Sequence, residues 1–368
     1  MKYLIFNVLF FTVLLVGCRK QLKPKAIQGI GSGVTVLNDH LNGIEIVIVG
    51  SGSLSFGVAY GREMPDGTTL IMENSILSLP VVCQDQDGND WDVFGVCVRG
   101  ERLGQQLPVL NSTLAYYFSY NAMFPGAEIY NRGSTDAPDP IQNEPDWSIN
   151  TEFVAALSNF DGIKSIDNPQ FILYKSRDYI DEPFFVTQDQ RITAVKIGNT
   201  VRAYPHNILV RHEIVNDEIE GVPFTLSFCP LTATSYCWKR ESDTYGVSGM
   251  LFNNNLILYD RNTISLWSQI LGKSVFGPFK DQTVERISVF ETTFSSLETF
   301  YDFKVEVMTL ETGFVFDYSF NPYGVYNSED AFLLLPNYFE DDRLPNKERV
   351  IGVEIDGVAK VFPISEFL

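Results

Sequence analysis

The sequence predicts a β-rich protein, mainly β-strands with a few short helices, in which two related lobes result from an internal duplication. Two observations lead to this prediction. Along most of the chain, short stretches that alternate apolar and polar residues are separated by Gly, Pro, Asn and Asp, which is the pattern of strands joined by turns. Two segments also recur elsewhere in the chain without a gap. The 368 residues are enough for one large or two moderate domains with a core.

The N-terminus has the features of a bacterial lipoprotein signal peptide. Met1–Gly17 contains one lysine and then an apolar run, too short and wrongly flanked for a membrane-spanning helix. Leu15–Cys18 resembles a lipobox, which implies cleavage before Cys18 and acylation of that cysteine, with palmitate as a typical chain. An ordinary signal peptide with a chance cysteine is the alternative. Residues 18–33 would then tether the protein to a membrane of the bacterial cell envelope, facing the periplasm or the exterior.

The composition limits the partners. The formal net charge of −19 argues against nucleic acid, which requires a basic surface to neutralise phosphates. Beyond the tether it also argues against adhesion to an anionic membrane. One or two disulfides are possible in an oxidising compartment, but a chain of this size does not require them. The cysteines that could form them are Cys83, Cys97, Cys229 and Cys237.

The first repeat pairs Val36–Glu63 with Ile214–Glu241. Its identical positions are Asn38/Asn216, Asp39/Asp217, Gly43/Gly221, Arg62/Arg240 and Glu63/Glu241. Asx side chains that precede a glycine are typical of turns, which favours a structural role for the two Asn-Asp pairs. Asn216 and Asp217 are nevertheless retained as candidate ligand-binding residues.

The second repeat pairs Arg191–Leu209 with Arg349–Phe367, and both segments have the pattern of a β-hairpin. In the second half of the chain this hairpin directly precedes the Asn-Asp segment, whereas in the first half its counterpart is the C-terminus. We therefore expect the last 20 or so residues to return and pair beside Val36–Val49. The predicted first lobe is 34–150 completed by 349–368, and the second is 151–348. A chance resemblance between two hairpins is the alternative.

Shorter segments that resemble one another follow the first repeat in each half. Trp91–Gly95 resembles Trp267–Gly272, and each is followed by a run with helical spacing, at Ser112–Ala122 and at Phe294–Tyr301. Asn131–Trp147 is rich in Pro, Gly, Asp and Asn, which predicts an exposed connector between the lobes.

The candidate chemistry centres on two thiols and an imidazole in the second lobe. Cys229 with His212 as its base could form a catalytic pair, and Cys229, Cys237 and His212 together could bind a soft metal such as copper or zinc. A disulfide or two buried apolar thiols are the alternative. In the first repeat the aligned residues are Ser51, Ala59 and Val34, so the shared fold does not need these side chains.

A second group of candidates runs from Tyr259 to Gln269. On a strand, alternate residues would share one face, forming a polar row that ends in an aromatic residue and could line a ligand pocket or face solvent. The candidate ligand-binding residues here are Asp260, Arg261, Thr263, Ser265, Trp267 and Gln269. His206 is expected to be exposed, and its counterpart in the second repeat is Ile364.

Several of these motifs resemble the bacterial family catalogued as domain of unknown function 3179. They include DGIKSIDNPQF (161–171), VRAYPHNILVRHEIVNDEIEGVP (201–223), SFCPLTAT (227–234), YGVSG (245–249), LYDRNTISLWSQ (258–269) and KERVIGVEIDG (347–357). The family's name implies no activity. Members often look like Cys-Pro-Leu-Cys where this chain has Cys229-Pro-Leu-Thr232, which puts any chemistry of a cysteine pair in doubt here.

The sequence therefore predicts a lipid-anchored cell-envelope protein that binds something in its second lobe, either a small ligand or a soft metal. A thiol-dependent enzyme or redox protein is one alternative. An interaction scaffold without a chemical site, with another envelope protein as its partner, is the other.

Overall fold

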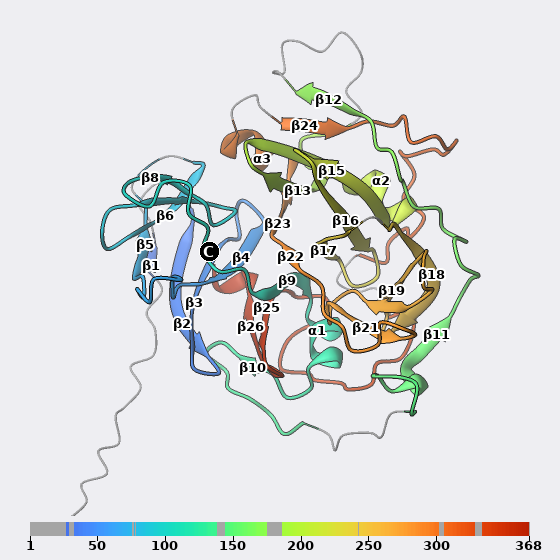
Figure 1. Ribbon diagram of the computed structural model, residues 1–368. Coiled ribbons are helices and arrows are strands. Elements are labelled where there is room, and N and C mark those ends of the chain that lie inside the picture. The colour runs from blue at the N-terminus through green and yellow to red at the C-terminus, as the bar shows by residue number, and fades with distance from the viewer. Residues whose placement is uncertain are drawn as a thin grey trace, which may run out of the picture.

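The computed structural model of the protein describes residues 27–28, 33–75, 77, 79–137, 144–174, 186–241, 243–301, 305–327 and 333–367. Within these residues the strands form six sheets and the helices are short, so the β-rich prediction is confirmed (Figure 1). The predicted signal peptide and almost all of the tether lie outside the described residues. No helix in the described part of the chain is long and apolar enough to cross a membrane.

Two sheets come from the N-terminal half, which is blue to teal in Figure 1. Their strand orders are β1-β2-β3-β4 and β5-β6-β7-β8. The strands are β1 Ile27–Gln28, β2 Thr35–Leu41, β3 Ile44–Ser51, β4 Phe56–Gly61, β5 Met72–Asn74, β6 Val81–Asp85, β7 Asp90–Asp92 and β8 Cys97–Arg99.

Two sheets of the second half have similar connections. Their orders are β15-β16-β17-β22 and β11-β18-β19-β20-β21. The strands are β11 Val154–Ala156, β15 Ile214–Ile219, β16 Val222–Cys229, β17 Thr234–Lys239, β18 Tyr245–Phe252, β19 Asn255–Asp260, β20 Leu266–Ser268, β21 Lys273–Phe276 and β22 Arg286–Ile287.

The two remaining sheets are each built on one of the predicted hairpins. Their orders are β9-β25-β26-β10 and β23-β13-β14-β24, with β12 added beside β24. In both, the first two pairings are antiparallel and the third is parallel. The strands are β9 Asn111–Tyr116, β10 Glu128–Ile129, β12 Phe171–Tyr174, β13 Arg191–Ile197, β14 Thr200–Pro205, β23 Val289–Thr293, β24 Val305–Met308, β25 Arg349–Ile355 and β26 Val358–Pro363.

The helices follow strands of these hairpin sheets. They are α1 Tyr117–Met123 after β9, α2 His206–His212 after β14, α3 Phe294–Phe300 after β23 and the 3-10 helix η3 Ile364–Glu366 after β26, whereas the 3-10 helix η1 Thr151–Phe153 precedes β11. The helix predicted over Ser112–Ala122 begins later than expected, because residues 111–116 pair with β25 as a strand.

The C-terminal hairpin returns to the first half of the chain, but it does not pair with the strand that we expected. β25 pairs with β9, and in Figure 1 these red and teal strands lie side by side. β2 is already bonded to β1 and β3. The hairpin instead covers the apolar face of the sheet that β2 and β3 form. Leu37 and Ile48 of that sheet lie in one core cluster with Ile351 and Phe362 of the hairpin. The hairpin therefore stacks on the sheet of β2.

A buried ion pair joins each hairpin to its Asn-Asp segment. In the first half, Lys360 of β26 lies 2.8 Å from Asp39 of β2. In the second half, Arg202 of β14 lies 2.8 Å from Asp217 of β15. A charge buried in a protein interior requires a partner. The two pairs therefore fix the same relation between hairpin and sheet in both halves.

The two halves also share a core. The largest cluster of buried side chains contains Phe56 of β4 and Trp91 of β7 together with Phe290 of β23 and Phe300 of α3. The rings of Phe56 and Phe300 meet edge to face with centroids 5.4 Å apart. Such contacts stabilise the packing of the second half's helix against the first half's sheets.

Substitution of Lys360 by Met should lower the free energy of unfolding by about 3–5 kcal/mol, because it leaves the buried carboxylate of Asp39 without its partner. Urea unfolding measures the effect, and adding Asp39→Asn should recover part of it. Lys239→Met is the matched control, since its pair with Glu285 is exposed and should contribute about 1 kcal/mol or less. Equal losses for the two single variants would contradict the role given to the Lys360 pair.

Candidate functional site

The two thiols predicted to act together lie on opposite faces of one sheet. Cys229 ends β16 and packs with Trp238 and Leu258, whereas Cys237 of β17 packs in the cluster that contains Leu226. All four cysteines among the described residues are free and buried. Burial raises the pKa of the Cys229 thiol to about 11, and Glu213 nearby adds to the effect. Cys229 is therefore a protonated thiol near neutral pH.

His212 is occupied by structural hydrogen bonds. Its Nδ1 lies 2.7 Å from the carbonyl oxygen of Lys164, and its Nε2 lies 2.7 Å from the hydroxyl of Tyr318. Cys229 instead donates to the carbonyl of Asn254 at 3.5 Å. In the part of the chain that the structure describes, no group of three or more His, Cys, Asp or Glu side chains could hold a metal ion. The geometry thus does not bring Cys229, Cys237 and His212 together, either as metal ligands or as a catalytic pair.

Asn216 and Asp217 have structural partners that recur in the first half. The Asn216 side chain bonds to the backbone of Tyr245 on β18, at 2.9 Å to its carbonyl and 3.0 Å from its N–H. Asn38 bonds in the same way to the backbone of Met72 on β5. Asp217 accepts from Arg202 and from Tyr204. These side chains connect neighbouring sheets through hydrogen bonds. Their polar atoms therefore already have partners within the protein.

The polar row expected on one strand face is interrupted by a turn. β19 ends at Asp260, and the buried carboxylate accepts from the backbone of Thr263 and Ser265, at 2.6 and 3.1 Å, which curls residues 260–265. The same carboxylate accepts from the indole N–H of Trp267 at 3.1 Å. In the first half Asp85 holds Trp91 at the same distance. Thr263 and Ser265 therefore belong to a turn and not to a strand.

The other residues of that row are held by the protein itself. Arg261 forms ion pairs with Asp161 and Asp167. Gln269 is fully buried and accepts from Thr234 at 2.6 Å and from Asn255 at 2.7 Å. Of the predicted ligand-binding residues, Asp260 and Trp267 border a cavity of about 530 Å³.

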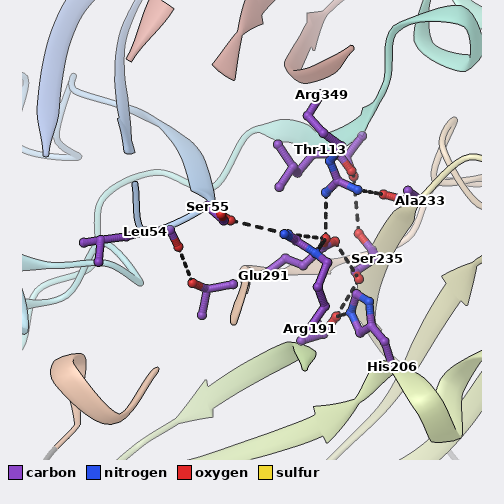
Figure 2. A network of polar contacts seen from close by, with 12 residues as sticks. Leu54, Ser55, Thr113, Arg191, His206, Ala233, Ser235, Glu291 and Arg349 are labelled. Carbon is purple, nitrogen blue, oxygen red and sulfur yellow. Dashed lines mark hydrogen bonds and ion pairs between the residues drawn. The ribbon is translucent and has the colours of Figure 1, made fainter. Parts of the chain in front are cut away.

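A buried polar network that the sequence analysis did not predict lies where the two halves meet (Figure 2). Its centre is Glu291 of β23, whose side chain is 2% exposed. Arg191 of β13 donates to one carboxylate oxygen at 2.8 Å, and Arg349 of the C-terminal hairpin donates to the same oxygen at 2.6 Å. Burial would raise the pKa of Glu291, but Arg349 and Arg191 lower it to about 2. Glu291 is therefore ionised near neutral pH.

The second carboxylate oxygen of Glu291 ends a chain of hydrogen bonds. Ser235 of β17 lies 3.2 Å from it, Thr193 lies 2.6 Å from Ser235, and Nε2 of His206 lies 2.9 Å from Thr193. An ionised carboxylate only accepts. Ser235 must then donate to Glu291, Thr193 to Ser235, and His206 through Nε2–H to Thr193. This order leaves the other ring nitrogen of His206, Nδ1, as a hydrogen-bond acceptor.

His206 was expected to be exposed, and this prediction is wrong: the side chain is buried against Phe228, with ring centroids 4.2 Å apart, and the residue is 7% exposed. Burial lowers its pKa to about 3. The ring borders an open cleft of about 490 Å³, here named the His206 cleft. The cleft lies between Gln190, α2 and the segment 318–321. A neutral imidazole thus forms part of its wall.

The corresponding positions in the first half are apolar. In the second half Thr193 of β13 pairs with Glu291 of β23. The corresponding pair in the first half is Ile351 of β25 with Leu114 of β9. His206 begins α2 after β14, and Ile364 begins η3 after β26. Gly57 is the counterpart of Ser235 in the first repeat. A Cβ added to Gly57 would meet the side chains of Ile351 and Ile364. The first half therefore forms the same sheet without the polar chain.

The sequence carried one sign of this network. Arg191 and Arg349 are identical in the second repeat, which marks both as candidates, but their shared partner Glu291 lies outside both repeats. Only the return of the C-terminal hairpin brings the two arginines to one carboxylate. Glu213 was also missed: burial raises its pKa to about 7, and it accepts from Tyr323 at 3.1 Å.

A family model described as "Protein of unknown function (DUF3179)" matches residues 160–368. No curated protein and no solved structure matches the chain.

His206 should make stability fall on the acid side of neutrality. An unfolded imidazole titrates near pH 6.5, and the folded one near 3, so unfolding takes up one proton between these values. The contribution of His206 to the free energy of unfolding is complete above pH 6.5. It declines by about 1.4 kcal/mol per pH unit as the pH falls towards 3. Urea unfolding at several pH values should show a flatter dependence for His206→Gln. His40→Gln, which removes an exposed imidazole, is the control, and an unchanged slope in His206→Gln would contradict the assignment.

Proposed function

The chain belongs to the DUF3179 family of proteins of unknown function, and from this premise we propose that it is a binding protein whose His206 cleft holds a small, uncharged ligand rich in hydroxyl groups, of the saccharide kind. The observation that carries the proposal is the hydrogen-bond chain from Glu291 to His206. It leaves Nδ1 of His206 as the acceptor of a buried, neutral imidazole, and this ring borders the cleft. An acceptor in this ring suits a ligand hydroxyl that donates.

The lining of the His206 cleft supports the same ligand class. Its polar side chains are mostly uncharged and include Gln190, Asn207 and Asn321. Amides both donate and accept, which matches hydroxyl groups that do the same. Phe228 and Phe320 add apolar surface, on which the C–H face of a sugar ring can pack. The Oδ1 atom of Asn207 is buried and has no hydrogen-bond partner among the described residues.

Binding fits the ionisation of the site better than catalysis does. A general base works best when its pKa lies near the working pH, whereas that of His206 is about 3. A thiol nucleophile requires a lowered pKa, whereas burial raises that of Cys229 to about 11. The alternative of a thiol-dependent enzyme therefore has less support than binding. Soft-metal binding by Cys229, Cys237 and His212 is not proposed, because these side chains are apart.

We further propose that the two halves descend from one duplicated unit. The matching orders of the hairpin sheets, the two ion pairs of Asp39 and Asp217, and the Asp-Trp bonds of Asp85 and Asp260 all support this origin. On this view the polar chain at His206 is an addition to one copy, because the other copy has apolar residues there. Side chains that a fold does not require are the ones in which function is expected.

We also propose that the protein is attached to a membrane of the cell envelope through acylated Cys18. The support is the sequence Leu15–Cys18 after an apolar run. Two or more acyl chains anchor a protein stably, since each buried methylene adds about 0.8 kcal/mol.

The binding proposal is tested with D-glucose, N-acetyl-D-glucosamine and maltose by saturation-transfer NMR. At least one sugar should bind, and His206→Ile, which introduces the residue of the corresponding first-half position, should weaken it about tenfold through loss of a hydrogen bond. Asn207→Ala and Phe320→Ala should also weaken it. Phe316→Ala, two residues before the segment 318–321 and not lining the cleft, is the matched control. Absence of binding by all three sugars, or equal binding by His206→Ile, would contradict the proposal.

The anchoring proposal is tested by labelling cells with a palmitate analogue and separating membranes from soluble protein. The full chain should be labelled and remain with the membranes. Cys18→Ala should lose the label and should not be recovered as processed, membrane-bound protein. Retention of the label by Cys18→Ala would show that acylation occurs elsewhere.

A further inference from the structure

The second half contains another cavity, whose lining shares no residue with the His206 cleft. It has a volume of about 530 Å³ and is bordered by the aromatic side chains Tyr245, Trp267 and Phe279. Pockets for small ligands have volumes of this order and are commonly lined by aromatic residues. We propose that this cavity, here named the Trp267 cavity, binds an organic cation such as a quaternary ammonium group.

The three rings form inclined walls. The centroids of Trp267 and Tyr245 are 5.8 Å apart with an angle of 78° between the ring planes, and those of Trp267 and Phe279 are 6.0 Å apart at 55°. Rings inclined to one another around a cavity can present their negative faces to one cation from several directions. The arrangement suits a rounded ligand more than a flat one.

The predicted polar residues of the turn hold these rings in position. Asp260 accepts from the indole N–H of Trp267 at 3.1 Å, which orients the largest wall. Ser265 accepts from the backbone N–H of Phe279 at 3.2 Å. Both are therefore positioning residues, and the cavity is preformed before a ligand enters. A preformed site binds with less loss of conformational freedom.

The charges around the cavity favour a cation. Its lining contains the acidic residues Glu241, Asp243, Asp260 and Glu285 and the basic residues Lys239 and Arg240. Lys239 is paired with Glu285, and Arg240 donates to the carbonyl of Phe224 at 3.2 Å. Four carboxylates against two basic groups leave the lining with a formal charge of −2, which adds to the attraction that the rings exert on a cation.

The first half provides a comparison without such a cavity wall. Asp85 holds Trp91 as Asp260 holds Trp267, but Trp91 is 0% exposed whereas Trp267 is 5% exposed. In the second half the Asn216 side chain bonds to the backbone of Tyr245. In the first half the corresponding bond runs from Asn38 to the backbone of Met72, so Met72 takes the place of Tyr245. The shared Asp-Trp bond is thus structural, and the added aromatic wall is specific to the second half.

The test is titration of the full-length protein with choline, followed by isothermal calorimetry and by tryptophan fluorescence. Choline should bind at least about tenfold more tightly than 3,3-dimethyl-1-butanol, its neutral isostere, because only the cation is attracted electrostatically to the ring faces. Phe279→Leu should reduce the affinity for choline several-fold while leaving the Asp260–Trp267 bond in place. Equal affinity for the two compounds, or no binding of choline, would overturn the proposal.

A charge experiment distinguishes the cavity from the overall negative charge. Glu241→Gln with Asp243→Asn should weaken choline binding several-fold at low salt. Asp87→Asn with Glu101→Gln changes the net charge by the same amount on exposed positions of the first half and should leave binding unchanged. Equal effects of the two double variants would show that choline responds only to the total charge, which also overturns the assignment to this cavity.

Discussion

The carboxylate of Glu291 is the group on which the meeting of the two halves depends. A buried carboxylate is unfavourable unless opposite charges and hydrogen-bond donors surround it. Arg191 comes from the second half, Arg349 comes from the last hairpin, and both donate to one oxygen. Movement of either arginine would remove one of the two charged donors of the carboxylate. The Glu291 carboxylate therefore fixes the position of β25 relative to β13 and, through Ser235, that of β17.

Around this centre, strands β4, β9, β17 and β23 come together. A small cavity of about 30 Å³ borders Thr113, Ser235 and Glu291, and it has room for about two water molecules. Thr113 also donates to the backbone carbonyl of Ser235 at 3.3 Å, which links β9 to β17. Since β9 requires the C-terminal hairpin as its partner, the first half cannot complete its sheets until the end of the chain is present. Folding thus depends on contacts between residues far apart in sequence, which generally slows it.

Local patterns predicted the strands and both hairpins, because alternation and turn residues are properties of short segments. The return of the C-terminus was also predictable, since the repeat of Arg191–Leu209 stands out of order in the chain. Its pairing with β9 was not, because that depends on which edges are already occupied. Burial of His206 could not be read from its place after Pro205. The opposite orientation of Cys229 and Cys237 follows from strand alternation and from the register of β16 and β17, which the sequence leaves open.

The difference between the halves is the strongest physical argument for where ligands bind. The first half fills the position of the polar chain with Leu114, Ile351 and Ile364, and replacement of buried ionic groups by apolar residues is commonly neutral or stabilising, by about 1–4 kcal/mol. The second half carries Glu291, Ser235, Thr193 and His206 there instead. Stability alone gives no reason for that choice, since the simpler apolar arrangement already exists in the same molecule. What the polar chain adds is an imidazole with a defined proton position at the wall of an open cleft.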